Sequence, residues 1–230
     1  MVQIIALQNA HDLPPALFES LLGFVSEDRK QRAKKFIRRE DACRSVIGEV
    51  LAKYCVAKAA GISVKAVSFH VDSFGKPHAN LERQIHFSVS HSKSWVVCAV
   101  DRSPIGIDVE YMREFDPDVA KRFFHPHEYA ALNALPEAER NGRFLDLWTI
   151  KESYSKALGK GLSLPLDSFE VLFENGTIRM KSLSPNPVMH FRQYDLGPDY
   201  RCAACSEHEA FCHEIRTMMP HQLLEEAMIN

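Results

Sequence analysis

The sequence predicts a fold of the mixed α/β class, with helices and strands in both halves of the chain. Long stretches of each half repeat apolar residues at helical spacing, and shorter runs alternate or are apolar throughout, as strands do. The 230 residues, 46% of them hydrophobic, are enough to bury a substantial core. A turn-like stretch at residues 101–104 lies between two strand patterns and divides the chain into expected domains of residues 1–103 and 104–230.

The N-terminal half contains two helical and three strand patterns. Helices are expected at residues 16–24 and 26–60, and strands at residues 64–71, 85–90 and 95–100. Gly61 is expected to end the second helix. In the second strand Ile85, Phe87 and Val89 alternate with polar residues, whereas the third strand is apolar throughout and typical of a buried central strand.

The C-terminal half also mixes the two types of element. A strand is expected at residues 105–110, helices at 117–135 and 140–158, and further strands at 167–173, 177–183, 188–194 and 200–205. Gly159 is expected to end the second helix. Cys202 and Cys205 form a CxxC pair that permits a zinc interpretation. Residues three apart on a strand point to opposite faces, however, so small buried side chains explain the pair better.

Charge and hydropathy exclude several classes of protein. Lys and Arg number 28 against 30 Asp and Glu, so the overall charge predicts no polyanionic partner such as a nucleic acid. The longest apolar run, Trp95–Val100, is far shorter than the roughly 20 residues of a membrane helix. The N-terminus lacks the basic start of a signal peptide, and the six cysteines are too scattered for a disulfide framework. We therefore expect a cytoplasmic protein.

Two polar segments of the N-terminal half are candidate anion sites. Residues 27–44 carry eight basic and four acidic side chains, which fits either a solvated helix face or a phosphate site. Residues 74–77 (Phe-Gly-Lys-Pro) and the end of the strand at Ser90 and His91 offer a cation, a hydroxyl and an imidazole. A polar turn or a hydrolase pair are the alternatives at Ser90, although no GxSxG motif is present.

A pair of carboxylates marks the first strand of the C-terminal half. Strand periodicity places Ile105, Ile107 and Val109 on one face and Asp108 and Glu110 on the other. Adjacent carboxylates repel each other unless a cation lies between them, and oxygen ligands at this spacing suit Mg²⁺. An edge strand with a solvated acidic face is the alternative.

The helix pattern over residues 140–158 combines an apolar stripe with a charged flank. Phe144, Leu147, Ile150 and Tyr154 share the stripe, whereas Trp148, Glu152 and Lys156 follow one another four residues apart. Glu152 is a candidate third metal ligand, and Lys156 a candidate phosphate contact. The alternative is an amphipathic helix with an ordinary Glu–Lys pair.

In order and spacing, these segments resemble the 4′-phosphopantetheinyl transferases of the long, surfactin-synthetase-activating type. The matching segments are residues 40–45, 74–77, 90–92, 106–110, 120–124, 148–156 and 159–169. The resemblance implies two similar α/β halves, a pseudo-dimer in which each half packs a small sheet on a long helix, with the active site between the halves. It implies transfer of the phosphopantetheine arm of coenzyme A to a serine of an apo carrier protein, releasing 3′,5′-ADP.

The resemblance also implies roles for individual residues. Asp108, Glu110 and Glu152 would hold Mg²⁺; Arg29, Arg32, Arg44, Lys76, Ser90 and His91 would contact coenzyme A; and Lys151 and Lys156 would approach its pyrophosphate. Among these, Asp108, His91, Glu152 and Lys156 are the expected catalytic residues, with Glu152 as the base for the serine proton. Arg29 and Arg32 stand where the family has lysine.

The expected partners are peptidyl, acyl or aryl carrier proteins, which are usually acidic. Lys121, Arg122, Phe123 and Phe124 offer two cations beside two aromatic rings and are the expected contact segment. A monomer is expected, because the two halves already form the site. The rival functions are a Mg²⁺-dependent phosphoesterase, and a non-enzymatic module for anions or nucleic acid built on the basic segment.

Overall fold

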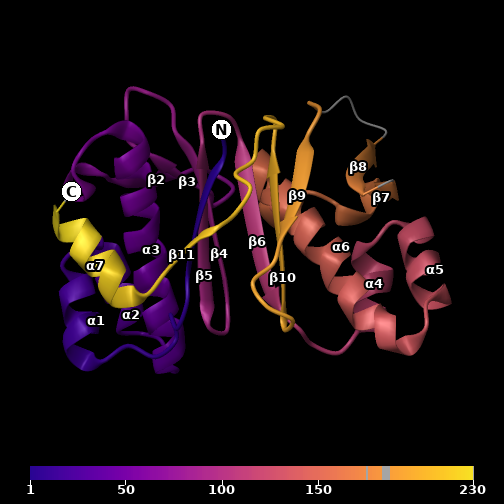
Figure 1. Cartoon of the computed structure of the whole chain (residues 1–230), viewed down its shortest axis with the longest axis horizontal. Helices are drawn as coiled ribbons and strands as arrows, with labels where there is room; N and C mark the ends of the chain where they lie inside the picture. The colour runs from indigo at the N-terminus through magenta and orange to yellow at the C-terminus, as the bar shows by residue number, and fades with distance from the viewer. Residues whose placement is uncertain (175, 183–186, 230) are drawn as a thin grey trace.

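Two β-sheets lie face to face between two long helices, which gives the chain four layers (Figure 1). The computed structural model describes residues 1–174, 176–182 and 187–229. The layers run from helix α3 through the sheet β11-β1-β5-β4 and the sheet β6-β10-β9 to helix α6. The mixed α/β class and the two-half plan expected from the sequence are confirmed.

The N-terminal layers draw on both ends of the chain. Their elements are β1 (Gln3–Leu7), α1 (Pro15–Leu22), α2 (Glu27–Ala33), α3 (Arg39–Ala60), β2 (Phe69–Val71), β3 (Pro77–Ala79), β4 (His86–Ser92), β5 (Trp95–Asp101), β11 (Arg216–Met218) and α7 (Pro220–Ile229). The C-terminal layers contain β6 (Ile105–Tyr111), α4 (Pro117–Phe123), α5 (Pro126–Ala134), α6 (Glu137–Leu158), β7 (Phe169–Glu174), β8 (Thr177–Ser182), β9 (His190–Tyr194) and β10 (Tyr200–Ser206).

Alternation along the central strands connects the layers. On β5, Val96 and Cys98 pack against the α3 side, whereas Val97 and Ala99 face the second sheet. On β6, Ile105, Ile107 and Val109 meet the first sheet in the same apolar interface. The apolar face predicted for β6 and the buried, central position predicted for β5 are confirmed. The polar face of β6 is turned toward α6.

Strand β10 separates the two cysteines of the CxxC pair. Cys202 is buried between the sheets, whereas Cys205 packs in the core around α6. Since the two thiols occupy opposite faces of one strand, they do not share a ligand position, as the strand pattern predicted.

Three predicted elements are divided or shorter in the structure. The helix expected over 26–60 breaks between α2 and α3, where basic residues four apart would repel each other along a continuous helix. The helix expected over 117–135 breaks before Pro126, which disfavours helical backbone at His125. Of the strand expected over 64–71, residues 69–71 are extended. Residue 183, part of another expected strand, lies outside the described residues.

The end of the chain returns to the N-terminal half. β11 pairs in parallel with β1, and Met218, Leu223 and Ala227 are buried in the core around α3. The expected domain of residues 104–230 is therefore wrong for its last segment, because the core of the N-terminal half includes apolar side chains of β11 and α7. Among the described helices, none is long and apolar enough to span a membrane.

Candidate active site

A row of serine hydroxyls joins β4 of the first sheet to β6 of the second. Ser88 Oγ accepts the N–H of Ile107 at 3.1 Å, and Ser92 Oγ accepts the N–H of Tyr111 at 3.0 Å. Ser90, two residues from each along the strand, donates to Asp108 Oδ1 at 2.7 Å. The alternation of serines on β4 thus builds a polar contact line between the halves, and the candidate site forms on this line.

Asp108 is the centre of this site. Its Oδ1 lies 2.6 Å from Lys156 Nζ of α6, which also donates to Ser90 Oγ at 2.9 Å. Its Oδ2 is buried and has no hydrogen-bond partner in the described part of the chain. A buried carboxylate oxygen without a partner is costly, and a bound cation would satisfy it.

Glu110 of β6 and Glu152 of α6 are close enough to Asp108 for its charge to act on both, and we call these three residues the carboxylate cluster. In the described part of the chain their oxygens do not all lie within 4.8 Å of one another. Glu110 also accepts a hydrogen bond from Ser92 Oγ at 3.2 Å. Burial raises the pKa of both glutamates, and the charge of Asp108 raises them further. Each carboxyl is less easily ionised than in water, and a divalent cation would reverse that effect. The oxygen donors therefore fit Mg²⁺.

Gly106 sets how closely α6 approaches the cluster. A Cβ at this position would lie 1.8 Å from Ser153 O and 2.6 Å from Ala157 N, both backbone atoms of α6. Glycine is thus the residue that permits β6 and α6 to pack at this separation, and the separation brings Lys156 to Asp108.

A basic pocket lies on the other side of β4. It has a volume of about 330 Å³, and we name it after Arg29, Arg44 and His91, although Asp41 and Glu49 also line it. The Arg29 guanidinium donates to Glu49 at 2.9 Å and to Ser45 at 2.9 Å. The surrounding protein atoms and the positive charge of Arg44 lower the pKa of His91.

The other predicted nucleotide contact, Arg32, is exposed on α2 and is not among the described residues lining the basic pocket. Arg44 is held at the pocket by Asp41 and by the carbonyl of Lys93, at 3.0 Å. The structure thus brings Arg29, Arg44 and His91 together and leaves Arg32 at the surface.

A second pocket of about 250 Å³ reaches Lys156, the lysine that contacts Asp108. It is lined by Phe74, Gly75, Lys76, Pro77, Phe87, Ser88, Val89, Lys156, Gly159 and Gly161. Pro77, Phe87 and Val89 also line the basic pocket, so the two cavities are neighbours. Together they connect the arginines with Lys156.

Lys76 joins the β2–β3 turn to the end of α6. Its Nζ donates to the carbonyls of Lys156 at 2.6 Å and Ala157 at 2.9 Å in the last turn of the helix, where the Lys156 carbonyl also accepts the N–H of Gly159. Gly159 lies directly beneath, since a Cβ there would approach Lys76 Cδ to 2.9 Å. The sequence indicated a phosphate contact at Lys76 and gave no sign of this contact between the halves.

The prediction that Lys151 approaches a pyrophosphate is wrong. Its ammonium is fully buried, 2.9 Å from Glu128, and donates to the carbonyls of Leu166 and Phe169. Lys151 lies one residue before Glu152 on α6, and its side chain therefore points to a different side of the helix, into the C-terminal core.

The expected carrier-binding segment is only partly at the surface. Lys121 and Arg122 are exposed on α4, and Phe123 is half-buried with its ring edge against Trp148. Phe124 is buried in the core of the C-terminal half, so its expected role as a surface contact is wrong. Two cations and one aromatic ring remain available.

Comparison with known families covers both halves of this site. Residues 14–103 match the family described as "4'-phosphopantetheinyl transferase, N-terminal", and residues 104–205 match the "4'-phosphopantetheinyl transferase superfamily". A "4'-phosphopantetheinyl transferase" of Bacillus subtilis is 40% identical over 207 residues, covering 90% of this chain and 92% of the relative.

One further relative and one solved structure are also similar to this chain. The "4'-phosphopantetheinyl transferase Sfp" of Bacillus subtilis strain 168 is 35% identical, covering 90% of this chain and 92% of that protein. Among solved structures, the holo-[acyl-carrier-protein] synthase of Thermotoga maritima aligns with a TM-score of 0.38 and 21% identity, covering 45% of this chain and 61% of that one.

Proposed function

The chain belongs to the 4′-phosphopantetheinyl transferase family, and we propose that it moves the 4′-phosphopantetheine arm of coenzyme A to a serine hydroxyl of an apo carrier protein, in a Mg²⁺-dependent reaction. The observation that carries this proposal is the continuity of the site. Two neighbouring pockets share Pro77, Phe87 and Val89, one lined by the arginines and the other by Lys156, and Lys156 contacts Asp108. This arrangement suits one long substrate with an anionic end and a reactive phosphate.

The basic pocket would take the nucleotide end of coenzyme A. Arg29 and Arg44 present forked guanidinium groups that match phosphate oxygens, and His91 adds a third donor when protonated. Arg32 would contribute from the rim of this region. A bound phosphate would favour the charged imidazole, and so oppose the lowered pKa of His91.

The reacting diphosphate would lie at the carboxylate cluster. Asp108, Glu110 and Glu152 would hold Mg²⁺, which supplies charge stabilisation for the phosphate oxygens. Lys156, already in place beside Asp108 and Ser90, adds a fixed positive charge where the leaving phosphate develops its negative charge. Lys76 lies in the neighbouring pocket and would reach the phosphates from the opposite half.

The chemistry needs one proton acceptor. The carrier serine oxygen attacks the β-phosphorus, the bridging P–O bond breaks, and 3′,5′-ADP leaves with the bond's electron pair. Glu152 would take the serine proton, directly or through a water. Lys156 neutralises the departing phosphate.

The carrier would dock on the exposed side of α4. Lys121 and Arg122 are free to meet acidic side chains, and Phe123 offers an apolar contact beside them. We propose a cytoplasmic monomer, because one chain supplies both halves of the site.

A transfer assay tests this function against its rivals. The protein is mixed with coenzyme A, Mg²⁺ and a panel of apo peptidyl, acyl and aryl carriers, and the carriers are analysed by mass spectrometry. We expect the phosphopantetheine adduct on serine with the wild type and with the surface control Glu19→Gln. Asp108→Asn and Glu152→Gln should give none. Phosphate release from simple esters without any adduct would favour the phosphoesterase instead.

A further inference from the structure

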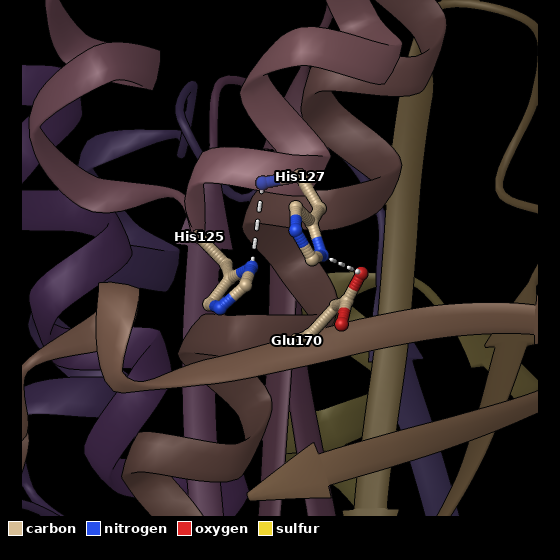
Figure 2. A group of neighbouring side chains, drawn as sticks. All are labelled: His125, His127 and Glu170. Carbon is tan, nitrogen blue, oxygen red and sulfur yellow. Dashed lines mark hydrogen bonds and ion pairs between the residues drawn. The ribbon is translucent and has the colours of Figure 1, made fainter.

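Two imidazoles and one carboxylate meet where the start of α5 lies against β7 (Figure 2). His125 is the N-cap residue that precedes α5, His127 lies in the first turn of α5, and Glu170 lies on β7. Each offers one ligand atom within 4.8 Å of the others. None of the three lines the basic pocket or its neighbour. We propose that they form a site for a Zn²⁺-like transition-metal ion, separate from the carboxylate cluster.

The spacing of two of the donors already fits a shared ion. His127 Nδ1 and Glu170 Oε1 are 3.2 Å apart. Two ligands of one tetrahedral zinc, each about 2.0–2.2 Å from the ion, lie roughly 3.4 Å from each other. The rings of His125 and His127 meet edge to face with centroids 4.9 Å apart, so the second imidazole needs only a small adjustment.

A buried carboxylate holds the two parts of the site in register. Glu128 accepts the N–H of His125 at 2.8 Å with one oxygen and the N–H of Val171 at 2.7 Å with the other. It therefore ties the backbone of the first histidine to the residue that follows Glu170. Lys151, 2.9 Å from Glu128, neutralises this carboxylate from within the core. These hydrogen bonds fix the backbone that carries the donors, so less conformational entropy is lost when a metal ion brings the donors together.

The donor set and its location select the type of ion. Two imidazoles and one carboxylate suit Zn²⁺, Ni²⁺ or Cu²⁺, whereas Mg²⁺ and Ca²⁺ prefer oxygen ligands. The positive end of the α5 dipole disfavours any cation here, so an ion that does not prefer imidazole ligands would bind weakly. The Nδ1 of His125 also accepts the N–H of His127 at 3.3 Å, and the metal would compete with this long hydrogen bond.

Such an ion would link the start of α5 to the β7–β8 hairpin through its ligands. His127 and Glu170 also line a cavity of about 320 Å³ between these elements, together with Arg143 and Phe173. The bound ion would therefore stabilise this edge of the C-terminal half, in proportion to its concentration relative to its dissociation constant.

Calorimetric titration of the full chain with ZnCl₂, in excess MgCl₂ to occupy the carboxylate cluster, tests the site. We expect one equivalent of Zn²⁺ to bind and to raise the Tm. His127→Ala and the near-isosteric Glu170→Gln should each weaken binding about 10- to 100-fold. The exposed control His221→Ala should bind as the wild type does.

The proposal is overturned if the wild type takes up no Zn²⁺, or if both variants retain wild-type affinity. Circular dichroism of the metal-free variants confirms folding, and His127, with a side chain 73% exposed, is removed without opening the core. A rise in Tm with MgCl₂ alone that Glu170→Gln abolishes would also contradict the assignment, since it would indicate an oxygen-preferring ion at this place.

Discussion

Replacing Gly106 by alanine should separate β6 from α6 and disable the site without touching a charged group. The new Cβ would lie 1.8 Å from Ser153 O, whereas real Cβ atoms essentially never approach closer than 3.0 Å, so the helix must move by at least 1.2 Å. The three atoms nearest to this Cβ, Ser153 O, Ala157 N and Ser153 C, are all backbone, so no rotamer change relieves the clash. The shift carries Lys156 away from Asp108, to which it now lies at 2.6 Å.

The expected loss has two parts. Overpacking of this kind costs about 1–3 kcal/mol, which lowers the Tm of a protein of this size by roughly 2–12 °C. A displacement of about 1 Å at a catalytic group costs about 100-fold in rate, equivalent to about 2.7 kcal/mol.

Thermal unfolding by circular dichroism and steady-state transfer to an apo carrier measure these two losses. Gly142→Ala is the matched control. Gly142 lies on α6 itself, and a Cβ there would meet only the flexible end of the Arg201 side chain, at 3.2 Å. This variant should keep or raise the Tm. A Gly106→Ala protein with wild-type Tm and rate would refute the reasoning that this glycine sets the position of α6.

Three other predictions follow from the charged groups. Lys151→Met should lower the free energy of unfolding by about 3–5 kcal/mol, because it leaves Glu128 buried and unpaired, yet the rate per folded molecule should be unchanged. Glu152→Gln should raise the Tm of the metal-free protein at neutral pH, because burial and Asp108 raise the pKa of Glu152 and folding with it ionised is costly. That gain in Tm should vanish as the pH falls below 4.5, the ordinary pKa of a glutamate. The double variant Lys121→Glu/Arg122→Glu should raise the KM for carrier with little change in the KM for coenzyme A.

Each of these has a clear contrary result. Loss of transfer in folded Lys151→Met, at constant stability, would restore the phosphate role that the buried geometry removes from this lysine. A lower Tm in metal-free Glu152→Gln at neutral pH would mean that the fold stabilises the ionised carboxylate of Glu152 rather than disfavouring it. Unchanged KM for carrier after charge reversal would place the carrier on another surface.

Local patterns predicted the parts of the site that depend on strand and helix periodicity. The alternation on β6 predicted Asp108 and Glu110 on one face, and the spacing on α6 predicted Glu152 and Lys156 on one flank. In the structure the charges of Asp108 and Lys156 act on both glutamates, and Lys156 contacts Asp108. These positions follow from backbone geometry alone.

Long-range packing decided the parts that the sequence did not predict. Lys151 and Lys156 are both lysines of α6, but Lys151 is held in the core by Glu128 and by the carbonyls of Leu166 and Phe169, all distant in the sequence. Phe124 is likewise buried by packing against Phe144 and the C-terminal core. The three-residue strand β11 is too short to show a period and is a strand because β1 pairs with it.

The position of β1 has a consequence for how the protein is made. One edge of β1 pairs with β5, but its other edge stays open until residues 216–218 have been synthesised, because β11 is its partner there. While only the N-terminal half has been synthesised, one edge of β1 is unpaired and the core lacks Met218, Leu223 and Ala227. A chain that lacks the residues after 215 therefore leaves the N-terminal half without part of its sheet and part of its core.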